Sequence, residues 1–78
     1  MTMIEAVAER IQGLLKEKNM TQRELEQRAG ISHGGMNRIL RGETANMALK
    51  TCLKIARGFG MKLGAFFDYP PLSPKNFV

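Results

Sequence analysis

The sequence is poor in residues that carry covalent, redox or metal-dependent chemistry. Its 78 residues include one cysteine, one histidine and no tryptophan. A single cysteine excludes an internal disulfide, and no cluster of metal-ligating residues accompanies it, so we expect a reducing environment, no metal and no cofactor. Paired carboxylates suited to a catalytic cleft are also missing, which leaves no assembled acid, base or nucleophile. The sequence therefore does not predict an enzyme.

Long hydrophobic runs are absent as well. No apolar stretch approaches the ~20 residues of a membrane span, and the N-terminal residues lack the basic and apolar regions of a secretion signal. We therefore expect a soluble, cytoplasmic protein without a membrane partner. A chain of this length forms one domain, which we place at residues 1–68. A proline-containing tail follows at residues 69–78.

The basic charge is concentrated in one part of the chain. The net charge is +5, yet residues 1–32 contain equal numbers of basic and acidic residues. Residues 33–62 contain six basic residues against Glu43 alone. Such a segment is typical of proteins that bind a polyanion such as nucleic acid, although ordinary solvation of a small basic protein explains it equally well.

Helical patterns run along the chain, and no alternating strand pattern appears. A first helix is predicted by apolar residues at helical spacing, namely Ile4, Val7, Ala8, Ile11, Leu14 and Leu15. Thr2 and Glu5 have the spacing of a capping box at its start. A second capping box is formed by Thr21 and Glu24, and Gly30 supplies the left-handed residue that ends the second helix.

A third helix begins almost at once. Ser32 is a favourable N-cap, and Ile31 and Met36 occupy the two positions of a hydrophobic staple. We expect this helix over residues 33–41, ending at Gly42. Two short helices joined by so tight a turn form a helix-turn-helix, whose second member enters the major groove of DNA.

Two more helices complete an all-α prediction. The fourth covers residues 47–58 with Asn46 as its cap, and its apolar face consists of Leu49, Cys52, Leu53 and Ala56. Its opposite face carries Lys50, Lys54 and Arg57. The fifth is short and runs through Phe67, with Leu63, Phe66 and Phe67 facing the core.

We expect Cys52 to be a buried, inert thiol. The tail is either disordered or packed through Tyr69, Leu72 and Phe77.

The ordered set of elements resembles the XRE-type helix-turn-helix domain of phage Cro and repressor proteins. The resemblance covers about residues 4–67 and is carried by "MTQRELEQRAGIS", by Met36, Ile39 and Gly42, and by "LKTCLKIARGFGMKL". It implies a compact five-helix bundle of the phage-repressor type, with the helix-turn-helix at the second and third helices. It also implies a DNA-binding transcriptional regulator, here expected to be a repressor that binds an inverted repeat as a homodimer.

The chain departs from the family pattern at a few positions. Glu43 and Met47 stand where the family often has a basic residue and a proline, which argues against a strong phosphate clamp between the third and fourth helices. Leu40 replaces a commonly acidic residue and adds apolar surface. Lys62 and Gly64 stand where the family commonly has a cap and an acidic residue, so we expect an irregular fifth helix.

The resemblance implies that the outward side of the third helix reads DNA, through His33, Gly34, Gly35 and Arg38. Arg38 can make a bidentate contact to guanine, worth about 1–3 kcal/mol of discrimination; the alternative is a surface salt bridge. Asn37 contacts either a base or a phosphate. His33 either donates to guanine or phosphate, or is simply solvated. The glycines fall in the first turn, where they reduce the number of reading side chains but let the backbone approach DNA closely.

Other residues are expected to contact phosphates or support the helix. By resemblance, Gln22 touches a phosphate and braces the third helix. Thr21, Arg41 and Thr44 are further phosphate contacts, and Ser32 belongs to the same DNA-binding set. The face with Lys50, Lys54 and Arg57 is interpreted as solvated.

The alternative function is an antitoxin or adaptor that uses the fold mainly to bind a partner protein. A steep salt dependence of DNA binding would argue against this alternative.

Overall fold

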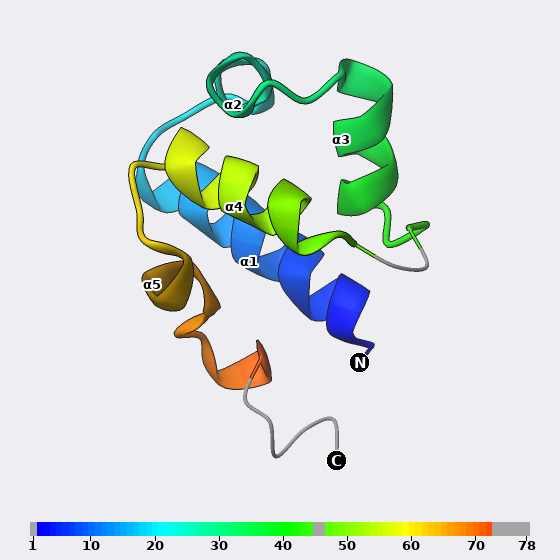
Figure 1. The fold of residues 1–78 in the computed structure, drawn as a ribbon, viewed down its shortest axis with the longest axis vertical. Helices are drawn as coiled ribbons and strands as arrows, with labels where there is room; N and C mark the ends of the chain where they lie inside the picture. The colour runs from blue at the N-terminus through cyan, green and yellow to red at the C-terminus, as the bar shows by residue number, and fades with distance from the viewer. Residues whose placement is uncertain (1, 45–46, 73–78) are drawn as a thin grey trace.

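The computed structural model describes residues 2–44 and 47–72, which form helices joined by short turns (Figure 1). The helices are α1 (Met3–Glu17), α2 (Gln22–Ala29), α3 (His33–Leu40), α4 (Leu49–Gly58), α5 (Leu63–Phe67) and the short 3-10 helix η1 (Pro70–Leu72). No strand occurs in this described part of the chain. The prediction of an all-α bundle with five α-helices is therefore confirmed.

The core is a single cluster to which every α-helix contributes. Helices α1 and α4 cross the middle of the molecule in Figure 1, and α3 stands beside them. Helix α4 packs chiefly on α2, and α1 packs on α3. The largest fully buried side chains are Phe66, Ile11, Leu25, Met36 and Ile55. Because Met36 anchors α3 to this cluster, the opposite side of α3 faces outward.

The starts of the first three helices agree with the sequence. Thr2 and Thr21 form capping boxes at α1 and α2. The Ser32 hydroxyl accepts a hydrogen bond from the Gly35 amide at 3.1 Å and so caps α3. Gly30, which ends α2, has a φ of 70°, and this left-handed conformation costs a glycine little. These local signals were predicted and are confirmed.

The boundaries of α3 and α4 differ slightly from prediction. Helix α3 ends at Leu40, with Arg41 as its C-cap rather than its last residue. Helix α4 begins at Leu49, two residues later than predicted, and its N-cap Ala48 provides no side-chain hydrogen bond. The predicted cap, Asn46, lies outside the described residues.

The predicted apolar face of α4 was partly wrong. Leu49 is 68% exposed and Leu53 is 42% exposed, whereas Ile55 is fully buried. The apolar residues of α4 form two overlapping faces at helical spacing, both of which include Cys52 and Ala56. Packing against α2 selects the face that contains Ile55. Cys52 is buried as predicted, and burial raises the pKa of its thiol.

Arg10 of α1 holds the end of α5 in place. Its Nε donates to the Phe66 carbonyl at 2.9 Å, and its Nη2 donates to the Ala65 carbonyl at 3.0 Å. Carbonyls at a helix C-terminus lack partners within the helix, so Arg10 caps α5 from another element. The guanidinium carbon also lies 5.2 Å from the centre of the Tyr69 ring, within the range of a cation–π contact.

Two of the three tail residues considered for packing do pack on the domain. Tyr69 lies against Arg10, and Leu72 in η1 packs against the core. Phe77 lies outside the described residues. Helix α5 is short and has no side-chain cap at Lys62, but it is α-helical throughout Leu63–Phe67 and shows no irregularity there.

Gly58 of α4 packs closely against Leu25 and Ala29 of α2. A Cβ at this position would lie 2.9 Å from Leu25 Cδ1 and 3.3 Å from the Ala29 backbone nitrogen. We expect Gly58→Ala to lower the free energy of unfolding by about 1–3 kcal/mol, because the buried neighbours have little room to move. Gly13 is the matched control, since a Cβ there meets nothing within 4 Å.

Gly13→Ala is expected to raise the free energy of unfolding by about 0.5–1 kcal/mol, since it replaces an exposed helical glycine. Urea unfolding of both variants measures the two effects. Equal effects at the two positions would contradict the close packing of α4 on α2.

Candidate nucleic-acid interface

Helices α2 and α3 form the predicted helix-turn-helix. The Gly30–Ser32 turn joins them, and α3 turns its Met36 and Ile39 side chains into the core. The outward side of α3 and the N-terminal end of α2 therefore share one surface of the molecule. This is the surface that the sequence predicted to meet DNA.

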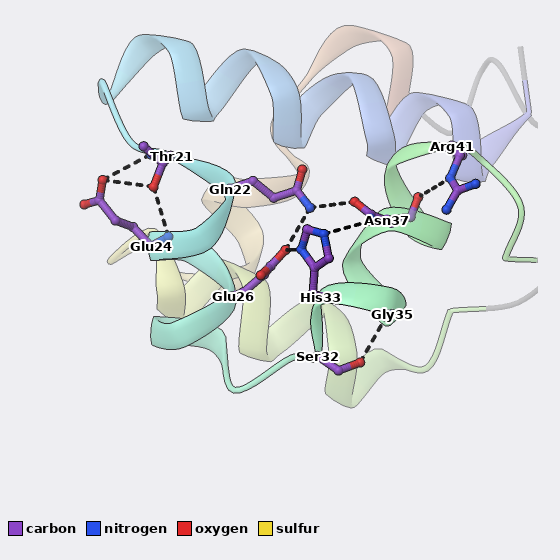
Figure 2. Close-up of polar contacts among 9 residues, drawn as sticks. All are labelled: Thr21, Gln22, Glu24, Glu26, Ser32, His33, Gly35, Asn37 and Arg41. Carbon is purple, nitrogen blue, oxygen red and sulfur yellow. Dashed lines mark hydrogen bonds and ion pairs between the residues drawn. The ribbon is translucent and has the colours of Figure 1, made fainter.

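A closed ring of hydrogen bonds links the two helices, as Figure 2 shows. Gln22 Nε2 donates to Glu26 Oε2 at 2.7 Å and to Asn37 Oδ1 at 2.8 Å. His33 Nδ1 lies 2.8 Å from the same Glu26 oxygen, and Asn37 Nδ2 lies 3.1 Å from His33 Nε2. We call these four residues the polar ring. Each helix supplies two of them, so the ring couples the placement of α3 to that of α2.

Glu26 is the ring member that sequence analysis missed. It is only 7% exposed. In the sequence it stands out only as one of the acidic residues that balance the basic residues of the segment 1–32. The hydrogen bond from Gln22 is the main cause that lowers the pKa of the Glu26 carboxyl, burial opposes it, and His33 lowers the pKa further. A usable signal was present, because Gln22 and Glu26, like His33 and Asn37, are spaced four residues apart on one helix face.

The polar ring engages three residues that were predicted to contact DNA. Gln22 donates both hydrogens of its amide nitrogen within the protein. Asn37 uses both its amide oxygen and its amide nitrogen. Both ring nitrogens of His33 are engaged even though its side chain is 72% exposed. These engaged groups link α3 to α2.

Arg38 lies outside the polar ring. Its side chain is exposed and makes no hydrogen bond or ion pair with residues 2–44 or 47–72. It lines a groove between α3 and α4 together with Thr44 and Lys54. Lys54 was interpreted as part of a solvated face, but the structure places it in the same groove as Arg38. A guanidinium without a partner in the described part of the chain is therefore available for a ligand.

The remaining predicted contacts lie at helix ends. The Thr21 hydroxyl accepts from the Glu24 amide at 3.1 Å, and Ser32 caps α3. Arg41 Nε donates to the Asn37 carbonyl at 3.4 Å, and its Nη1 lies 3.9 Å from a Glu43 carboxylate oxygen. An exposed ion pair of this kind contributes little to stability, so Arg41 is easily released to another anion.

The two glycines of α3 have different surroundings. A Cβ at Gly34 would meet nothing within 4 Å, whereas a Cβ at Gly35 would lie 3.0 Å from the Ser32 hydroxyl oxygen. The missing side chain at Gly35 therefore leaves room for the N-cap of its own helix. At Gly34 the space remains open to the outside.

The geometry and the sequence together define a helix-turn-helix DNA-binding protein. Residues 10–71 match the Cro/C1-type HTH DNA-binding domain. The chain therefore belongs to this family of DNA-binding regulators, and the resemblance to XRE-type domains is confirmed. Neither a search of curated proteins nor a search of solved structures gave a significant match.

None of the helices in the described residues is both long enough and apolar enough to cross a membrane. Within the same residues, no group of three or more His, Cys, Asp or Glu side chains is placed to hold a metal ion.

The lowered pKa of Glu26 predicts an acid-dependent loss of stability. A carboxyl whose pKa is lower in the folded state stabilises the fold above its ordinary value, here 4.5, and loses this contribution as the pH falls through the lower folded value. We expect the free energy of unfolding to fall more steeply below about pH 4.5 in the wild type than in Glu26→Gln, which cannot titrate there.

Urea unfolding between about pH 3 and pH 7 measures this difference. The control is Glu17→Gln, because the Glu17 side chain is exposed and makes no hydrogen bond in the described part of the chain. It should keep the wild-type pH dependence. Identical pH dependence in Glu26→Gln and the wild type would contradict the prediction.

Proposed function

We propose that this protein is a sequence-specific transcriptional repressor that binds double-stranded DNA as a homodimer. Helix α3 enters the major groove of an inverted-repeat operator. The observation that carries the proposal is Arg38, an exposed guanidinium on the outward side of α3 without a partner in the described residues. A guanidinium can donate to guanine O6 and N7 together, and such a contact contributes about 1–3 kcal/mol of discrimination.

The proposed DNA-binding set has three parts. Arg38 reads a base, and the open N-terminal turn at Gly34 and Gly35 lies closest to the DNA. The polar-ring members Gln22, His33 and Asn37 hold the surface in shape. Phosphate contacts come from Thr21, Ser32, Arg41 and Thr44, and these position the domain without reading sequence. The groove position of Lys54 adds it to the candidates for phosphate contact.

The proposed homodimer is supported by an exposed apolar surface. Met3, Leu49 and Leu53 are the exposed large hydrophobic residues of the described chain. Met3 and Leu49 line a cleft together with Met47, and Met47 also lines the groove beside Arg38. A second copy seated on this cleft would lie next to the DNA-facing groove. One domain makes few base contacts, so two copies on one operator raise the affinity to a useful level.

The same apolar surface also favours the second candidate function, an antitoxin or adaptor that binds a partner protein. The two functions differ in how DNA binding depends on salt. Neutralised phosphates release counterions, so operator binding weakens steeply as the salt concentration rises. A protein that uses the fold mainly to bind a protein partner should not show this salt-dependent binding to an operator.

Selection of duplexes from a randomised DNA library at near-physiological salt tests the proposal. We expect enrichment of an inverted repeat with half-sites about ten base pairs apart and a steep salt dependence of its binding. Arg38→Ala should relax base preference at one position per half-site, whereas Arg57→Ala, at the end of α4 that lies away from α3 in Figure 1, should not. Selection of no duplex, or unchanged preference in Arg38→Ala, counts against the proposal.

Gly34 tests how closely α3 approaches DNA. Gly34→Ala adds a methyl group into open space, so the variant should fold with wild-type or slightly higher stability. If the backbone lies against the operator, the methyl group should weaken binding to the selected duplex by about tenfold, or roughly 1.4 kcal/mol. Gly13→Ala serves as the control on α1. Equal affinity of the Gly34→Ala variant and the wild type would show that this turn does not closely approach the DNA.

A further inference from the structure

One group sets the direction of every hydrogen bond in the polar ring. The ionised Glu26 carboxylate can only accept, so the two atoms that face it, Gln22 Nε2 and His33 Nδ1, must carry hydrogens. Gln22 Nε2 donates its other hydrogen to Asn37, whose facing atom is therefore the amide oxygen. The Asn37 nitrogen then donates to His33 Nε2, which must accept. The ring is complete only when His33 is neutral and protonated on Nδ1.

No other order of hydrogens satisfies the ring. A hydrogen on His33 Nε2 would face the Asn37 amide nitrogen, which is also a donor. Turning the Asn37 amide over moves the conflict to Gln22, because two amide nitrogens then face each other. Turning the Gln22 amide over moves the conflict to Glu26, where two acceptors would meet at the 2.7 Å contact. The conflict cannot be removed while the carboxylate is ionised.

We propose that Glu26 is a positioning residue for DNA readout. This role of Glu26 rests on the proposed DNA-binding function and deepens that function. Glu26 selects the Nδ1–H form of His33 and, through Gln22, fixes the orientation of the Asn37 amide. One hydrogen of the Asn37 amide nitrogen and one acceptor site of its oxygen are thereby engaged within the protein. Base reading is left to Arg38 and to the open turn at Gly34.

The surroundings of Glu26 favour this role over a merely stabilising one. Its side chain is 8% exposed, and Arg23, Glu26 and His33 line one small pocket at the surface. Its two hydrogen-bond partners are both residues of the proposed DNA surface. A positioning residue should therefore affect discrimination between DNA sequences more than folding.

The first test measures the tautomer of His33 in the free protein. The chain contains one histidine, so the imidazole nitrogen signals in a ¹⁵N-labelled sample belong to His33 without further assignment. In the neutral imidazole we expect Nδ1 to be protonated and Nε2 to be unprotonated. Glu26→Leu, which removes the acceptor, should give a mixture of the two neutral tautomers. A wild-type imidazole protonated on Nε2 would overturn the proposal, whatever the fate of the variants.

The second test compares binding to the selected duplex with binding to a scrambled duplex. Glu26→Leu should lower the ratio of the two affinities by about tenfold, while the slope of affinity against salt stays at the wild-type value because no phosphate-neutralising group is removed. Glu26→Gln should restore most of the ratio, since its amide oxygen can accept both hydrogen bonds. The control Glu17→Gln should leave the ratio unchanged.

Two results would separate this inference from the proposed function. An unchanged ratio in a folded Glu26→Leu variant, or an equal loss of affinity for both duplexes, would overturn the positioning role and leave the function standing. A wild-type protein that selects no duplex would defeat the proposed function, and the tautomer measurement would then decide alone whether Glu26 sets the order of hydrogens in the ring.

Discussion

A buried carboxylate has to be compensated where it lies, because an uncompensated charge away from water is costly. In this protein that carboxylate belongs to Glu26, 7% exposed in α2. It is compensated by Gln22 from the same helix and by His33 from α3. Both partners come from the surface that a helix-turn-helix turns towards DNA. The orientation of the His33 and Asn37 side chains therefore depends on how one negative charge is compensated.

The same constraint explains how a helix with two glycines can still serve a DNA-binding surface. Gly35 leaves room for the Ser32 cap, and Gly34 keeps the first turn open. The polar ring, which includes His33 of this turn, links α3 to α2. Arg38 extends from α3 into the groove shared with α4.

The fold was largely predictable from sequence because its signals are local. Capping boxes, the left-handed Gly30 and the helical spacing of apolar residues each depend on a few neighbouring positions. The buried face of α4 was not predictable in full, since its apolar residues suit two faces and only packing against α2 excludes Leu53. The ring was missed for a related reason. The spacing within each helix was visible, but the meeting of Glu26 with His33 depends on how two helices cross.

The division of the ring between two helices has a consequence for altering the surface of α3. Helix α3 cannot be exchanged independently of α2. Foreign residues grafted at positions 33 and 37 would leave the carboxylate facing groups of the wrong hydrogen-bonding type. The surface of α3 can therefore be changed in two ways. Positions outside the ring, such as 34 and 38, can be exchanged alone, or both helices can be transplanted together with all four ring positions.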